Sequence, residues 1–177
     1  MSRRVSLNAR LAHEAVGSKE VEVVLLHITH PETNQIIRLS TDPTARISYS
    51  PLAYGTRSTW RDADPDDDDD AYLFILMSVL VPDDQEDSPP AAQLVLEAVD
   101  NRIADVLRST TERATVNMAL VLASTPDLVE QEWLNFKLVS AEGSADSITL
   151  SISRDPVTAE PWPAGRMTRD RFPGLHP

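Results

Sequence analysis

Apolar residues recur in this chain with the two-residue period, or in the short runs, that are typical of β-strands. In 134–138 and 148–152 every second residue is apolar, and the turn sequence AEGSAD lies between them, so a hairpin is predicted. A second hairpin is predicted for 20–30 and 36–40, which flank PETNQ. Single strands are predicted for 72–82, 92–99 and 114–124. The alternation in the last range places these residues on one face: Val116, Met118, Leu120 and Leu122.

Two stretches show the 3.6-residue period of an α-helix instead. In residues 6–16, Leu7 and Leu11 lie one helical turn apart, and Ser6 can cap the first turn. Residues 100–110 have the same period. We therefore expect a short N-terminal helix and one short internal helix.

The order of these elements lacks the strand–helix–strand rhythm of parallel sheets. We predict an α+β fold that is mainly antiparallel β, a sandwich or open barrel of about 6–7 strands. One β-rich domain is expected over 1–160, followed by an extended arm over 161–177. Residues 41–70 combine turn-forming residues with aromatics and aspartates, so they are expected to form a long acidic excursion with little regular structure.

Acidic residues are concentrated in that excursion and in the DDQED segment, and the 177-residue chain has a formal net charge of -12. Seven aspartates lie in the last part of the excursion, RDADPDDDDD (61–70): Asp62, Asp64, Asp66, Asp67, Asp68, Asp69 and Asp70. A calcium loop that began at Asp62 would need glycine where Asp67 lies and glutamate where Leu73 lies. We expect a solvated, mobile or lumen-facing loop, with a weak cation site as the alternative.

The C-terminal sequence EPWPAGRMTRDRFPGLHP has neither period and contains four prolines. Residues 161–177 carry three arginines and one aspartate, so a basic end follows an acidic body. Proline restricts the backbone, and a stiff arm loses little entropy when it orders on a neighbour. The residues expected to contact that neighbour are Trp162, Arg166, Arg169, Arg171, Phe172 and Leu175.

Residues that could carry chemistry are few. His27 and His30 would point to opposite faces of a strand, and Ser144 lies in a turn without the sequence context of a nucleophile. None of the five glycines forms a phosphate-binding loop. The three tryptophans are expected in a core or an interface rather than in a ligand-stacking set: Trp60, Trp133 and Trp162. We expect no catalytic residue, no metal and no cofactor.

The sequence also indicates which cellular location and which kinds of partner to expect. The longest apolar run, 71–81, is too short to cross a bilayer, and the first residues lack the apolar region of a secretion signal. The chain has no cysteine, so disulfides and thiolate chemistry are excluded. We expect a soluble protein without membrane insertion. The acidic body also argues against specific nucleic-acid binding.

The endings FPGL (172–175) and EPWPAGRMT (160–168) resemble those of a phage-related family of unknown function. That family is encoded among the tail-tip genes of long-tailed, siphophage-type phages and prophages. The stretches LNAR, VVLLHITHPE, QLVLEAVDNRIADVLRS and VNMALVLASTPDLVE agree in the same order. The chain departs from the family in its longer, more acidic 53–70 segment and in its final residues.

The resemblance implies a structural virion protein of the phage tail tip, assembled in the host cytoplasm. It would form a ring with copies of itself and connect neighbouring tail-tube and tail-hub proteins. Acidic loops that face the channel would then repel passing DNA. A carbohydrate- or receptor-binding sandwich that uses the aromatic segment 49–60 is the alternative, and a hydrolase with an unrecognised site is a third hypothesis.

Overall fold

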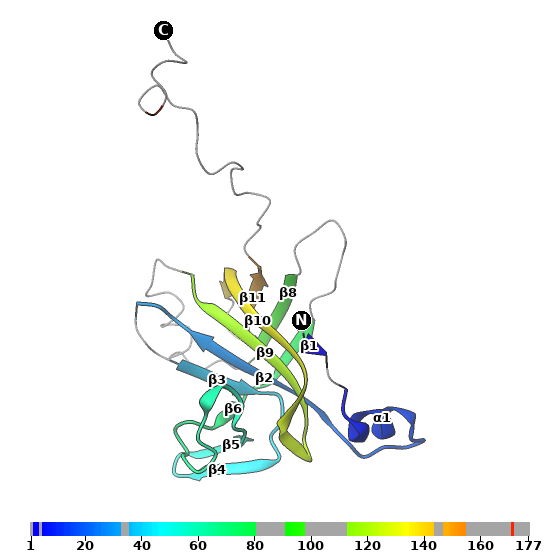
Figure 1. Cartoon of the computed structure of the whole chain (residues 1–177). Helices are drawn as coiled ribbons and strands as arrows, with labels where there is room; N and C mark the ends of the chain where they lie inside the picture. Colours follow the sequence, from blue (N-terminus) through cyan, green and yellow to red (C-terminus); the bar gives the residue numbers. More distant parts are fainter. Residues whose placement is uncertain are drawn as a thin grey trace.

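The computed structural model describes residues 2–3, 5–32, 36–80, 91–97, 113–143, 147–154 and 171. Within them lie one sheet of eleven strands, one α-helix and one 3-10 turn (Figure 1). In chain order the elements are β1 (Ser2–Arg3), α1 (Leu7–Glu14), β2 (Glu22–Thr29), β3 (Ile36–Ser40), β4 (Ala45–Tyr49), β5 (Leu52–Thr56), η1 (Trp60–Asp62), β6 (Tyr72–Phe74), β7 (Met77–Leu80), β8 (Ala91–Glu97), β9 (Thr115–Leu122), β10 (Thr125–Gly143) and β11 (Ser147–Ser153).

Ten strands lie side by side in the order β4-β5-β6-β3-β2-β9-β10-β11-β8-β7, and β1 pairs with β10 outside this path. Every described pair is antiparallel except β3 with β6, so the mainly antiparallel β fold is confirmed. The strands form one open sheet rather than the two of a sandwich. The predicted sandwich is therefore wrong, and the sheet has more strands than the 6–7 that were predicted.

The segment 72–80 contributes strands to two distant places in this order, because β6 lies between β5 and β3 whereas β7 lies at one end, beside β8. Its first half, β6, pairs with β3, whereas its second half, β7, pairs with β8. The change occurs between Ile75, whose N–H donates to the Ser40 carbonyl at 3.0 Å, and Leu76, whose carbonyl accepts from the Glu97 N–H at 2.8 Å. The single strand predicted for 72–82 is therefore two strands, because its hydrogen-bond partner changes midway.

One face of the sheet carries the larger apolar core, whose central side chains are Leu26, Leu39, Leu94, Met118, Trp133, Phe136 and Leu150. These residues come from strands far apart in the sheet order, so the sheet must curve around them. Of the four residues predicted to share a face, Val116, Met118 and Leu120 pack in this core. The fourth, Leu122, is also buried but does not belong to this cluster.

The opposite face of β2 and β9 is also covered. Val23, Leu25 and Val121 lie in a second cluster under Trp60 and Tyr72. Apolar side chains on both faces explain why β2 reads as a nearly continuous apolar run.

The expectation of little regular structure over 41–70 is wrong for its first half, where β4 and β5 form a hairpin around Ser50 and Pro51. Each strand is only five residues long, so the alternation is too short to read from sequence. Gly55 allows β5 to approach β6, because a Cβ there would lie 1.9 Å from the Tyr72 carbonyl oxygen.

Strand β10 is far longer than the range 134–138 predicted for it. Its pairing with β9 shifts register between Trp133 and Phe136, and Asn135 in between has a φ of 61°. Trp133 and Phe136 therefore both enter the larger core, whereas Leu134 packs against the second cluster. This irregularity interrupts the alternation on which the prediction rested.

The N-terminal helix is confirmed as α1, whose Ser6 cap accepts from the Ala9 N–H at 3.1 Å. Its buried residue is Ala9, whereas Leu7 and Leu11 are exposed. The predicted internal helix, 100–110, lies outside the described residues. In the part of the chain that is described, no helix has the length and apolar character needed to span a membrane.

Candidate functional site

A buried polar group crosses three strands of the sheet. His27 on β2 lies opposite Asn117 on β9, and the Asn117 amide nitrogen is 3.3 Å from His27 Nδ1. Asn117 Oδ1 accepts from the Asn135 N–H at 2.9 Å, at the irregular point of β10. Burial, with Arg38 and Arg61 nearby, lowers the pKa of His27 from 6.5 to about 4. The imidazole is therefore neutral near pH 7.

Two arginines lie beside this histidine. Arg38 on β3 is directly across from His27 and donates to Asp70 at 2.6 Å. Arg61 and Asp62 both have a φ of 57°, in the left-handed region that costs free energy for such residues. Within the described residues, the buried Nε atoms of Arg38 and Arg61 have no hydrogen-bond partner.

Tyr72 completes this group. Its hydroxyl donates to the Trp60 carbonyl oxygen at 2.7 Å, and burial raises its pKa to about 12. The phenol thus stays protonated and holds the η1 turn on the sheet. The group as a whole fastens the segment that contains the aspartates to β2, β3 and β9.

The aspartate loop is ordered by its own contacts. Arg57 pairs with Asp68 and donates to the carbonyl oxygens of Pro65 at 2.6 Å and Ile47 at 3.3 Å. Side chains within the loop cap its backbone, as where Asp64 accepts from the N–H of Asp66 at 3.0 Å. Six carboxylates of the loop are exposed: Asp62, Asp64, Asp66, Asp67, Asp68 and Asp69. Across the described residues, no set of three His, Asp or Glu side chains is arranged to hold a metal ion.

The other residues considered for chemistry are separated. His30 is buried and its Nδ1 accepts from the Glu32 N–H at 3.1 Å, whereas His27 lies beside Asn117. Trp60 and Trp133 are buried in different clusters, so these two do not form a stacking surface.

Most of the predicted arm residues lie beyond the part of the chain that the structure describes. Of the residues assigned to the arm, Arg171 is described and exposed. Outside the described residues lie Ser144, Trp162, Arg166, Arg169, Phe172 and Leu175.

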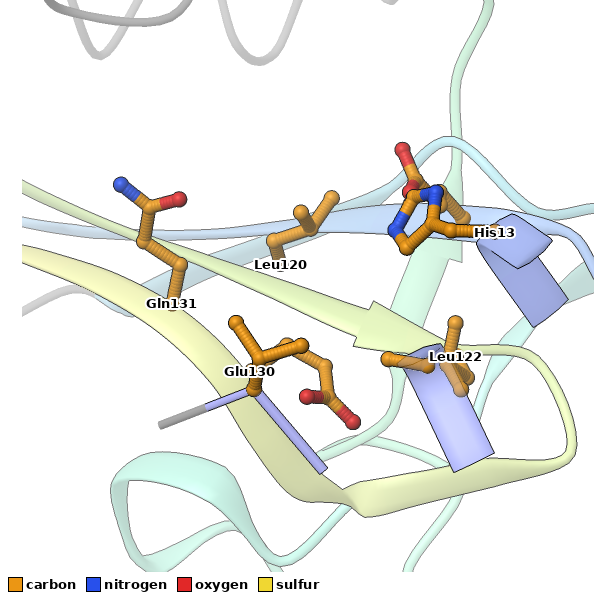
Figure 2. Close-up of a pocket in the computed structure, with 8 residues that line it drawn as sticks. His13, Leu120, Leu122, Glu130 and Gln131 are labelled. Carbon is orange, nitrogen blue, oxygen red and sulfur yellow. The ribbon is translucent and has the colours of Figure 1, made fainter. Parts of the chain in front are cut away.

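A small pocket of about 60 Å³ lies between α1 and the ends of β9 and β10 (Figure 2). It is lined by Val5, Ala9, His13, Glu22, Leu120, Leu122, Glu130 and Gln131. Glu130 is buried, and its Oε2 accepts from the Ser6 N–H at 2.6 Å. No partner for its Oε1 exists among the described residues. Glu130 lies outside the ranges predicted as strands, so no pattern in the sequence indicated that it would be buried in a pocket.

The pocket's second polar pair is His13 Nε2 and Glu22 Oε1, at 3.2 Å. Together these groups can hold a small polar or positively charged species. Their evident structural effect is to attach α1 to the sheet, because a carboxylate near a helix N-terminus is stabilising.

Large apolar side chains are exposed at several places in the described part of the chain, and two groups of them lie on α1 and on the β4–β5 hairpin. The helix patch consists of Leu7, Arg10 and Leu11 on α1, with Leu7 71% and Leu11 56% exposed. The hairpin patch consists of Tyr49, Leu52 and Tyr54 on β4 and β5, with Tyr49 79% and Leu52 61% exposed. Exposed apolar groups that gather in this way are typical of protein interaction sites.

The elements that carry these patches, α1 and the β4–β5 hairpin, appear on either side of the β9–β10 turn in Figure 1. On one flank the turn bonds to the segment after α1, because Ser124 N–H donates to Glu20 at 3.0 Å. On the other flank Thr59 N–H donates to Asp127 at 2.7 Å.

Protein-family models gave no match to this chain, and no curated protein is significantly similar to it.

Proposed function

We propose that this chain is a structural virion protein of a phage tail tip, where copies of it form a ring that connects the tail tube to the receptor-binding hub. The resemblance described above, which extends in order along nearly the whole chain, motivates this assignment. We interpret the curled sheet as an open barrel whose interior is packed with side chains.

The observation that carries the proposal is the pair of exposed patches on opposite flanks of the β9–β10 turn. A subunit of a ring must contact one neighbour on each side, and it does so through two different surfaces. The helix patch and the hairpin patch are two such surfaces, and each exposes more than one large apolar side chain.

The acidic loop also suits a position next to a DNA channel. Its carboxylates are exposed, yet Arg57 and Arg38 hold the loop against the body through Asp68 and Asp70. Fixed negative charge that faces the channel would repel DNA phosphates and keep the passing genome from adhering.

Native mass spectrometry of the full chain and electron microscopy of the purified particle test the proposal. The expected result is a closed oligomer of one size, and antibody labelling at the distal end of the tail. A chain that is absent from particles overturns the proposal, as does one that stays monomeric both in solution and in particles.

The alternative function is carbohydrate or receptor binding by the segment 49–60. The exposure of Tyr49 and Tyr54 favours it, although Trp60 of the same segment is buried. If the segment 49–60 binds carbohydrate, a bound glycan should protect Tyr49 and Tyr54 from fluorescence quenching. A glycan array without any response counts against it.

A further inference from the structure

We propose that the helix patch of one copy of this chain docks on the hairpin patch of the next copy, in a head-to-tail contact. The inference deepens the proposed ring by naming its interface, and it therefore rests on that proposed function. The occupant of each patch is a second copy of the same chain.

The helix patch has the form of a docking helix. Leu7 and Leu11 are one turn apart, Arg10 shares their face, and all three are exposed. An amphipathic helix normally turns such residues toward its own core, but α1 buries Ala9 instead. Apolar side chains spaced by four residues are the means by which a helix binds a partner surface.

The hairpin patch offers a suitable partner. It lies at the end of the sheet order, where β4 has no further strand beside it among the described residues. Leu52 is paired with Tyr49 across the hairpin, so the two exposed side chains are neighbours. Tyrosine is enriched where proteins bind one another, because it buries a large apolar ring and keeps a polar hydroxyl.

Charge favours contact between unlike patches. Arg10, which is exposed, supplies a positive charge within the helix patch. The acidic loop lies next to the hairpin patch, because Arg57 bonds both Asp68 and the carbonyl oxygen of Ile47 on β4. Arg46, stacked 4.5 Å from the Tyr49 ring centre, adds one positive charge there.

Contact between like patches is disfavoured by the same charges. Two helix patches would bring arginines together, and two hairpin patches would bring acidic loops together; like charges across an interface are costly. A contact between unlike patches leaves the hairpin patch of one copy and the helix patch of the other free, so copies continue to add until a ring closes.

Disulfide cross-linking tests this contact cleanly, because the natural chain has no cysteine. Leu11→Cys and Leu52→Cys are prepared as separate full-length variants, with Val139→Cys, at another exposed apolar position, as the control. Oxidation of mixed Leu11→Cys and Leu52→Cys should give a covalent dimer. Either variant alone, or either one mixed with the control, should give at least tenfold less. A chain that carries both substitutions should give a ladder of covalent multimers.

The outcomes separate this inference from the proposed function. If native mass spectrometry shows the oligomer and the mixed variants do not cross-link, the head-to-tail contact is wrong and the ring proposal stands. Equal cross-linking of Leu11→Cys with itself also overturns the inference. If the chain is monomeric in solution and in particles, both proposals fail.

Discussion

Glu130 accepts a hydrogen bond from the backbone N–H of Ser6 at 2.6 Å, although the two residues are 124 positions apart in the sequence. Ser6 is also the N-cap of α1. The carboxylate therefore ties the beginning of the helix to strand β10 while the apolar side chains Leu7 and Leu11 remain outside. This contact explains how α1 is positioned with so little apolar burial of its own.

Replacement of Glu130 by alanine should loosen α1. A hydrogen bond to a charged group contributes about 1.5–3 kcal/mol, so urea unfolding should show a loss of about that size. Amide hydrogen exchange should accelerate across Leu7–Glu14. Glu142→Ala, at an exposed position of the same strand, is the control and should change neither quantity. Unchanged exchange in Glu130→Ala would show that the helix is held by other contacts.

Two aspartates of the acidic loop should differ sharply in their effect on stability. Asp70→Asn leaves the nearly buried Arg38 guanidinium without its charged partner. Breaking a fully buried pair lowers the free energy of unfolding by about 3–5 kcal/mol, and the loss here should be smaller because Asp70 is partly exposed. Asp68→Asn breaks an exposed pair with Arg57 and should cost less than about 1 kcal/mol. Equal losses in thermal or urea unfolding would contradict the assigned role of Asp70.

The neutral state of His27 should make stability depend on pH. Its pKa is about 4 in the folded chain and near 6.5 when exposed, so the unfolded chain binds more protons between these values. Stability is therefore complete above pH 6.5 and falls as the pH drops toward 4. His27→Gln should flatten this part of the curve relative to His13→Gln. An NMR titration of His27 with a midpoint near 6.5 would refute the assignment.

Deletion of residues 161–177 should leave the fold intact, because the described sheet ends at Ser153 on β11. If the segment binds a neighbour as its sequence predicts, the truncated chain should unfold at the same urea concentration and lose the oligomer in native mass spectrometry. An independent check in the full-length chain is the triple change of Arg166, Arg169 and Arg171 to Ser, which should weaken the oligomer and reduce the salt dependence of its assembly. A truncated chain that still forms the full oligomer would show that the arm is dispensable.

Local patterns in the sequence were sufficient for much of the fold. Residues 148–152 alternate cleanly, and β11 places Ile148, Leu150 and Ile152 in the core as expected. The cap at Ser6 marked the start of α1. These features could be predicted because the hydrogen bonds and apolar faces that define them involve residues close together in the chain.

Other features depend on partners that are far away in the chain. The strand partner changes within 72–80 because β6 pairs with β3 and β7 pairs with β8. Similarly, α1 leaves Leu7 and Leu11 exposed while Glu130 on β10 holds its first turn. The candidate surfaces likewise arise only when β4, α1 and the β9–β10 turn are placed in space. The sequence by itself determined the strand-rich composition, the helix start and the unequal distribution of charge. The tertiary structure decided the single curled sheet, the buried His27 and Arg38 group and the exposed patches, because the choice of a distant pairing partner leaves no periodic trace in the sequence.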